Sequence, residues 1–346
     1  MDIFVPDRAE QGFVTADGTA ALLEGSAPFS HPAGVSAPQV EPSRLRSNER
    51  SVVVNGVELV YERFGRQQDP AIILIMGLGG QLLSWPLSLC EALVREGYQV
   101  IRFDNRDAGL SSKFDHCGTP GMLRMLGAHS FGQGLDAPYR LEHMVADTVG
   151  LMDRLNLEDA HIVGISMGGM IAQIMAARYP HRVKSLVSMM STSGAPDLPG
   201  PSLKLRLRLA RQRATEPRAA LADAVRSIAL VGSPGYPRTL QELEQTLMPQ
   251  IERGISPDGT LRQLAAILVS GSRAALLPQI QAPTLILHGE ADRLVPVAAA
   301  HDLLERIPHA HGDIVPGLGH DLPPSALPRM TDSLIAHLQR ASEYHG

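Results

Sequence analysis

The sequence predicts an α/β protein with a mostly parallel sheet that is covered by helices on both faces. Short apolar runs alternate with stretches of helical spacing, and the runs span 71–76, 99–103, 161–165, 183–190, 283–288 and 312–315. Continuous apolar strands separated by helices are typical of parallel sheets that are buried on both sides. In addition, a glycine-rich turn joins the run at 161–165 directly to a helical pattern at 167–178. This alternation and this turn together define the predicted fold class.

Composition excludes several classes of protein. With 346 residues, 44% hydrophobic and 19% charged, the chain is long enough to form a core without disulfides or structural metal. The net charge of −5 shows no basic excess, which argues against nucleic acid as a partner. Cys90 and Cys117 lack metal-binding spacing, and the chain has neither a long apolar segment nor the layout of a signal peptide. We therefore expect a cytoplasmic protein without stable membrane insertion.

The first elements are predicted from turn residues and periodicity. Residues 1–48 are rich in Pro, Ser and Gly, and we expect an extended N-terminal arm there. From Ser51, the runs S-V-V-V and V-E-L-V-Y-E flank Asn55-Gly56, which predicts a β-hairpin. Helices are then expected near 86–95, 141–155, 167–178, 297–306 and 325–340.

Two stretches interrupt the alternation of strands and helices. Residues 112–138 are glycine-rich and too long for a simple connection, and residues 191–278 are mostly helical in pattern. We expect an α/β core of 49–190 and 279–346 with a helical cap at 191–278. Both interruptions should leave the sheet at the edge where open α/β sheets bind ligands.

The strongest chemical signal is the pentapeptide Gly164-Ile165-Ser166-Met167-Gly168, between an apolar run and a helical pattern. A serine on such a strand-to-helix turn exposes its hydroxyl above the sheet, as a nucleophile requires. We therefore expect Ser166 to be a catalytic nucleophile.

A serine nucleophile needs a base and an orienting carboxylate, in the chain order Ser, acid, His. Asp292 and His320 each follow a predicted strand and satisfy that order. Asp197 is an alternative acid, although it lies several residues beyond the end of its strand. Asp104 and Asp107 precede the nucleophile and are better suited to fixing a turn.

The remaining histidines give no clear site. His161 and His288 fall within strands and are interpreted as packed side chains. His309 and His311 have metal-like spacing but no evident third ligand, so no metal is expected. No cofactor is expected either, because the chain's glycine-rich loop lacks both the dinucleotide fingerprint and the P-loop pattern.

The transition state of acyl transfer needs donors for an oxyanion. One is expected from the backbone N–H of Met167, and the second from Leu78 in the loop M-G-L-G-G after the first buried run. Gly77 and Gly79 let this backbone approach a substrate, and Trp85 follows closely. We therefore predict Gly77, Gly79 and Trp85 as substrate-binding residues.

Together, the segments M-G-L-G-G, G-I-S-M-G, D-R-L-V-P and G-L-G-H resemble the α/β-hydrolase superfamily over residues 50–340. Within it, I-M-G-L-G-G-Q-L-L-S-W-P, R-F-D-N-R-D-A-G-L-S-S and G-I-S-M-G-G-M-I-A-Q resemble bacterial esterases of the aclacinomycin methylesterase-like branch. The resemblance implies a capped hydrolase fold with the triad Ser166, Asp292 and His320. Met76 stands where many members have His, which leaves the role of the backbone donor intact.

The expected function is a carboxylesterase that acts on a small-molecule ester with an apolar part, through an acyl-enzyme intermediate. Two alternatives stay open. The same triad serves hydrolases of lactones or activated C–C bonds, and some members of the fold only bind ligands or transfer acyl groups.

Overall fold

The computed structural model describes residues 48–121, 135–203, 205 and 214–344. The described residues form one eight-stranded sheet in the order β1-β2-β4-β3-β5-β6-β7-β8. The strands are β1 (Glu49–Val54), β2 (Val57–Phe64), β3 (Ala71–Ile75), β4 (Gln99–Phe103), β5 (Ala160–Ile165), β6 (Val183–Met189), β7 (Thr284–Gly289) and β8 (His311–Val315). The predicted arm at 1–48 falls almost entirely outside the described residues.

The predicted hairpin is confirmed. Val54 pairs with Val57 across a two-residue turn, in which Asn55 has a φ of 51° and Gly56 a φ of 75°. Two positive φ angles are those of the type I′ turn, whose twist matches that of the two strands. β2 pairs antiparallel with β4, whereas all the later pairs are parallel, so the predicted mostly parallel sheet is confirmed as well.

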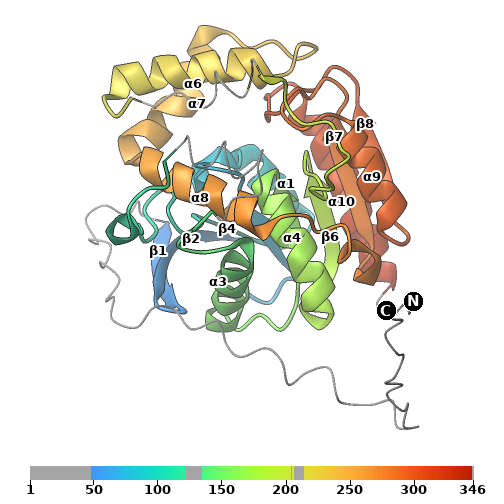
Figure 1. The fold of residues 1–346 in the computed structure, drawn as a ribbon. Helices are drawn as coiled ribbons and strands as arrows, with labels where there is room; N and C mark the ends of the chain where they lie inside the picture. Colours follow the sequence, from blue (N-terminus) through green and yellow to red (C-terminus); the bar gives the residue numbers. More distant parts are fainter. Residues whose placement is uncertain (1–47, 122–134, 204, 206–213, 345–346) are drawn as a thin grey trace, which may run out of the picture. The chain divides into compact units, whose positions relative to one another are not determined.

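Helices cover both faces of the sheet (Figure 1). One core cluster joins the sheet to α3 (Leu141–Arg154), α4 (Met167–Arg178) and α9 (Ala298–Arg306). The other joins it to α1 (Leu87–Arg95) and α10 (Leu327–Tyr344). Within β3, Ile73 and Ile75 face the first cluster, while Ile72 and Leu74 face the second. This double burial explains why the strand reads as a continuous apolar run.

Short 3₁₀ helices connect several of these elements: η2 (Leu82–Ser84), η3 (Asp115–Cys117), η4 (Pro180–Arg182) and η5 (Leu277–Gln279).

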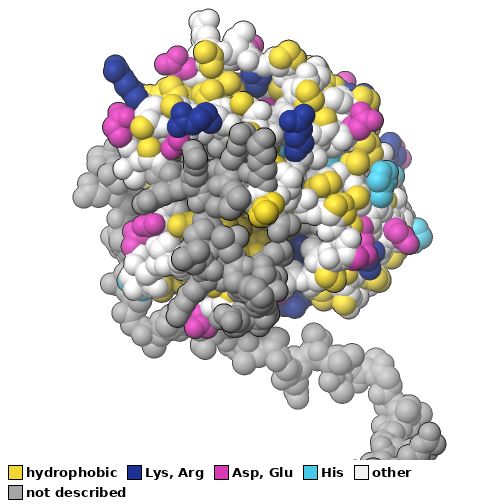
Figure 2. All heavy atoms as spheres, turned by 45° about the horizontal axis from the view of Figure 1, so that its top comes forward, with side chains coloured by type: hydrophobic (Ala, Val, Ile, Leu, Met, Phe, Trp, Pro, Cys, Tyr) yellow, Lys and Arg dark blue, Asp and Glu magenta, His cyan; other side chains and the backbone are white. Residues whose placement is uncertain are grey.

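Among the described residues between β6 and β7, where the sequence indicated a helical pattern, three helices occur. They are α6 (Pro217–Val231), α7 (Leu240–Arg253) and α8 (Pro257–Ser270). α6 packs on α7, and α8 contacts α3. Figure 2 shows the face that contains α6 and α7, where basic and acidic side chains are scattered among hydrophobic ones. Of the other predicted interruption, at 112–138, residues 122–134 lie outside the described part.

No helix among the described residues combines the length and the apolar character needed to cross a membrane.

Candidate active site

Ser166 lies on a sharp turn between β5 and α4. Its φ of 55° is in the left-handed region, which a serine rarely occupies. The turn is tightly packed, since a Cβ added at Gly168 would lie 2.0 Å from the carbonyl oxygen of Ile75 at the end of β3. The Ser166 N–H donates to Met189 O on β6, at 2.8 Å. The neighbouring strands thus fix the serine in its strained conformation, half-exposed at the carboxyl edge of the sheet.

The structure brings Ser166, His320 and Asp292 together in one chain of hydrogen bonds. Ser166 Oγ lies 3.0 Å from His320 Nε2, and His320 Nδ1 lies 2.6 Å from Asp292 Oδ2. The other oxygen of Asp292 accepts the N–H groups of Leu294 and Val295, both at 2.8 Å. These two bonds orient the buried carboxylate toward the imidazole, so that Nδ1–H donates and Nε2 is left to accept the serine proton.

None of the competing residues takes part in this chain of hydrogen bonds. Asp197 is exposed, whereas Asp292 is buried beside His320. His161 and His288 are buried on their strands, which confirms them as packed side chains. His288 Nε2 donates to Val295 O at 2.8 Å and lies 3.7 Å from Asp292 Oδ2. Burial lowers the pKa of His288, so this neighbour stays uncharged at neutral pH.

The M-G-L-G-G loop after β3 lies against Ser166. A Cβ added at Gly77 would be 3.1 Å from Ser166 Cβ. The Gly80 N–H donates to Gly77 O at 3.1 Å, which closes a four-residue turn. Among the described residues, the backbone N–H groups of Leu78 and Met167 have no acceptor. The predicted oxyanion donors are therefore both available at the edge that holds Ser166.

Two residues of the R-F-D-N segment hold the ends of this loop. Asp104 Oδ1 accepts the Leu82 N–H at 2.7 Å, and Asn105 Nδ2 donates to Met76 O at 3.0 Å. Arg253 from the end of α7 pairs with Asp104 at 2.6 Å, inside the protein. The interpretation that this segment fixes a turn is thereby confirmed.

The structure places the predicted substrate-binding residues in two different environments. Gly77 lies beside Ser166, and Gly79 lies in the same turn. The Trp85 side chain is fully buried in the core cluster with α1 and α10, so it offers no surface to a substrate. Trp85 is close to the loop in sequence, but the chain turns at η2 and directs its ring into the core.

Sequence reasoning missed two polar side chains from the segment between β6 and β7. Gln263 Oε1 accepts the Gly79 N–H at 2.8 Å, and Ser233 Oγ accepts the Gly319 N–H at 2.8 Å, one residue before His320. Neither belongs to a motif, and the chain carried no local signal that would have found them.

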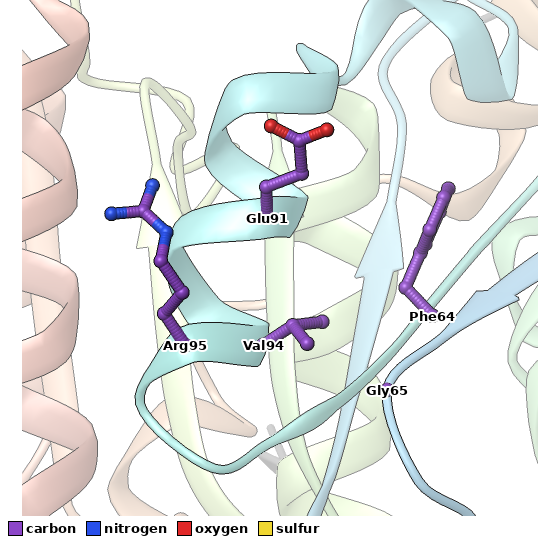
Figure 3. Close-up of a pocket in the computed structure, with 5 residues that line it drawn as sticks. All are labelled: Phe64, Gly65, Glu91, Val94 and Arg95. Carbon is purple, nitrogen blue, oxygen red and sulfur yellow. The ribbon is translucent and has the colours of Figure 1, made fainter.

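A surface pocket of about 410 Å³ lies elsewhere, between the end of β2 and α1 (Figure 3). Phe64 and Gly65 line one side, and Glu91, Val94 and Arg95 line the other. Phe64 pairs with the start of β4, so the pocket belongs to the amino edge of the parallel strands, opposite to the serine. In the close-up, Arg95 extends away from Phe64, so the charged groups do not converge on a ligand position.

No cluster of three or more metal-ligating side chains occurs among the described residues. Of the H-x-H pair, His311 lies 2.8 Å from an Arg340 nitrogen, and its ring lies 5.1 Å from the ring of His337, tilted by 47°. Both neighbours are nitrogen-containing side chains, and neither supplies a carboxylate or thiol that would complete a metal site.

Comparisons with known proteins find a family and several relatives. The model of the family described as α/β hydrolase fold matches residues 70–324. Rhodomycin D methylesterase DnrP of Streptomyces peucetius is 26% identical over 87% of this chain and 99% of its own length. The 3-oxoadipate enol-lactonase 2 of Acinetobacter baylyi is 27% identical over 75% of this chain and 85% of its own.

Among solved structures, the enol-lactonase of Burkholderia xenovorans superposes with a TM-score of 0.64 at 24% identity, covering 84% of this chain and all of the other. That likeness concerns the fold. Because the family model spans the sheet from β3 to the histidine loop, and a methylesterase matches along most of the chain, the protein belongs to the α/β-hydrolase family.

Proposed function

We propose that the protein is a carboxylic ester hydrolase that uses Ser166 as nucleophile, His320 as general base and acid, and Asp292 as the orienting carboxylate. The observation that carries the proposal is the continuous chain of short contacts from Ser166 Oγ through His320 to Asp292. The named methylesterases among the relatives support an ester as the substrate.

The reaction follows from this arrangement. Ser166 Oγ attacks the ester carbonyl while its proton passes to His320 Nε2, and the oxyanion is held by the N–H groups of Leu78 and Met167. The tetrahedral intermediate collapses with loss of the alcohol, which takes the proton from His320. Water then adds to the acyl group on Ser166, giving its proton to His320, and the carboxylic acid leaves as Ser166 regains a proton.

The test combines an assay with covalent labelling. Hydrolysis of p-nitrophenyl acetate should fall by about four to six orders of magnitude in Ser166→Ala, since only oxyanion and binding contributions remain. A fluorophosphonate should label the wild type and not this variant. The matched control is Ser51→Ala, an exposed position on β1, which should keep full activity. A folded Ser166→Ala protein with more than about a tenth of wild-type activity is incompatible with the nucleophile assignment.

A second candidate is hydrolysis of a lactone by the same three residues. It is favoured by the enol-lactonase among the relatives. A panel of acyclic p-nitrophenyl esters and lactones with matched carbon number separates the two, because kcat/KM ranks the substrates by binding of their transition states.

We further propose that residues 191–278 act as a cap that limits the size of the substrate. α6, α7 and α8 all belong to this segment, which leaves the sheet after β6 and returns before β7. Leu247 on α7 and Leu268 on α8 are half-buried, as residues that line a partly open site would be. Leu247→Ala and Leu268→Ala should therefore shift the preferred acyl-chain length, whereas Leu240→Ala, at an exposed position, should not.

A further inference from the structure

The loop that carries Leu78 is held from two directions. Its ends are fixed by the core, through Asn105 to Met76 O and Asp104 to the Leu82 N–H. Its centre is fixed from α8, where Gln263 Oε1 accepts the Gly79 N–H at 2.8 Å. Among the described residues, this is the one side-chain hydrogen bond to the turn at 77–80.

The centre of the turn is the part that most needs a restraint. Gly79 has a φ of 67°, and the turn closes from Gly80 N–H to Gly77 O. A positive φ at the third residue alone is that of a type II turn, which glycine adopts easily and also leaves easily. Rotation of the peptide between Leu78 and Gly79 would convert the turn. The Leu78 N–H belongs to the preceding peptide, so it would be displaced as the Leu78 backbone adjusts to the converted turn.

Gln263 opposes this rotation because it accepts from that same peptide. The helix also approaches closely here, since a Cβ on Gly79 would lie 2.6 Å from Thr260 Oγ1. Any side chain at position 79 would push α8 away from the loop. Glycine is therefore required for the turn and for the contact with Gln263 alike.

Gln263 is itself rigidly held. It is fully buried, and its Nε2 donates to Arg106 O at 2.7 Å. The Arg106 side chain forms a buried bidentate pair with Asp147 on α3, at 2.6 and 2.7 Å. A continuous series of contacts thus runs from α3 through Arg106 and Gln263 to the Gly79 peptide. Such a pair has the fixed geometry that a positioning contact needs.

From these contacts we infer that Gln263 is a positioning residue for catalysis: by holding the Gly79 peptide it keeps the backbone of Leu78, whose N–H is the proposed oxyanion donor, in place. The inference rests on the proposed function, since it concerns the same site. It also means that α8 influences the rate of the reaction, in addition to the proposed role of the cap in limiting the size of the substrate.

Gln263→Met tests the inference, because it removes both hydrogen bonds at similar side-chain volume. With p-nitrophenyl acetate we expect kcat to fall about 10- to 100-fold, somewhat less than for outright loss of an oxyanion donor. KM should stay within about threefold, because the donor acts mainly in the transition state. The control is Ser270→Ala, which removes another contact of α8 with the core, the Leu141 N–H to Ser270 Oγ bond. Its kcat should match the wild type, and an equal kcat in Gln263→Met would overturn the inference.

Gln263→Glu gives a second test, which holds even if the Met variant fails to fold. A protonated Glu donates to Arg106 O and accepts from Gly79, as Gln does, whereas an ionised one is repelled by Arg106 O. Burial raises the pKa of such a carboxyl, so it should titrate within about pH 5 to 9. We expect kcat of Gln263→Glu relative to wild type to fall across this range. A ratio that stays constant or rises would overturn the inference.

The outcomes also separate this inference from the proposed function. If the wild type neither hydrolyses esters nor reacts with a fluorophosphonate, the proposed function fails. If Ser166→Ala abolishes both reactions while Gln263→Met behaves like Ser270→Ala, the proposed function stands and the role of Gln263 is refuted.

Discussion

Ser233 donates a hydrogen bond from its hydroxyl to Asp321 Oδ1, although 88 positions separate the two residues in the chain. The same hydroxyl accepts the Gly319 N–H, and Val231 O accepts the His320 N–H at 2.7 Å. The end of α6 and the residues just after it therefore hold the loop of the proposed base on both sides. Burial raises the pKa of Asp321, and the bond from Ser233 acts in the opposite direction.

Ser233→Ala should lower kcat by loosening this loop. The change leaves the Gly319 N–H without its acceptor and removes the hydroxyl that donates to Asp321. The cost should be about 1–3 kcal/mol in the free energy of unfolding. We expect kcat for ester hydrolysis to drop while the chain-length preference is retained. Ser227→Ala is the control, since that hydroxyl bonds to Asp223 O within α6. Equal kcat values for the two variants would show that the loop does not depend on Ser233.

Asp292→Asn should cost on the order of ten-thousandfold in kcat, because the amide would stabilise the wrong tautomer of His320. Asp197→Asn is the natural comparison, since Asp197 is exposed and was the alternative acid. It should retain wild-type kcat. A large loss in Asp197→Asn together with a small one in Asp292→Asn would move the acid to Asp197.

Gly168→Ala should destabilise the fold and reduce activity. The new methyl group would lie 2.0 Å from Ile75 O and 2.9 Å from Met76 O, so β3 or α4 must move. Overpacking of this kind costs about 1–3 kcal/mol or more. The melting temperature and kcat should fall together. Gly121→Ala should change neither, since no atom of the described residues lies within 4 Å of the added Cβ.

The structure also predicts that one buried histidine makes the folded protein less stable at acidic pH. Burial, together with His311, His161 and Arg340, lowers the pKa of His337 on α10 to about 3. The unfolded chain therefore binds more protons between pH 6.5 and 3, and stability is lost as the pH falls through this window. Between pH 7.5 and 5, His337 should account for about 2 kcal/mol of this loss.

Urea unfolding at these two pH values measures the effect. In His337→Gln, the difference in the free energy of unfolding between pH 7.5 and 5 should shrink by about that amount. His301→Gln should leave the difference unchanged, because His301 is exposed in the folded protein. A wild-type pH dependence in His337→Gln would contradict the assignment to this histidine.

Local patterns in the sequence were sufficient for the strands, the hairpin at Asn55 and the serine turn. Each of these depends on residues that are neighbours in the chain: alternation of apolar runs, turn residues, or small residues around Ser166. The chain order of Ser166, Asp292 and His320 also pointed to residues that the structure places in contact. Strand ends meet at one edge of a parallel sheet, so side chains that follow those ends converge there.

Tertiary structure alone decided which polar side chains form hydrogen bonds to the loops at the carboxyl edge of the sheet. Gln263 reaches Gly79 across 184 residues, and Ser233 reaches Asp321 across 88. A single long-range hydrogen bond leaves no periodicity and no motif in the sequence, so it cannot be seen before the helices are packed. The same holds for Trp85, whose nearness to the loop in sequence suggested contact with substrate. The direction of the chain through η2 buried its ring instead, because a side chain's surroundings depend on packing rather than on its neighbours in sequence.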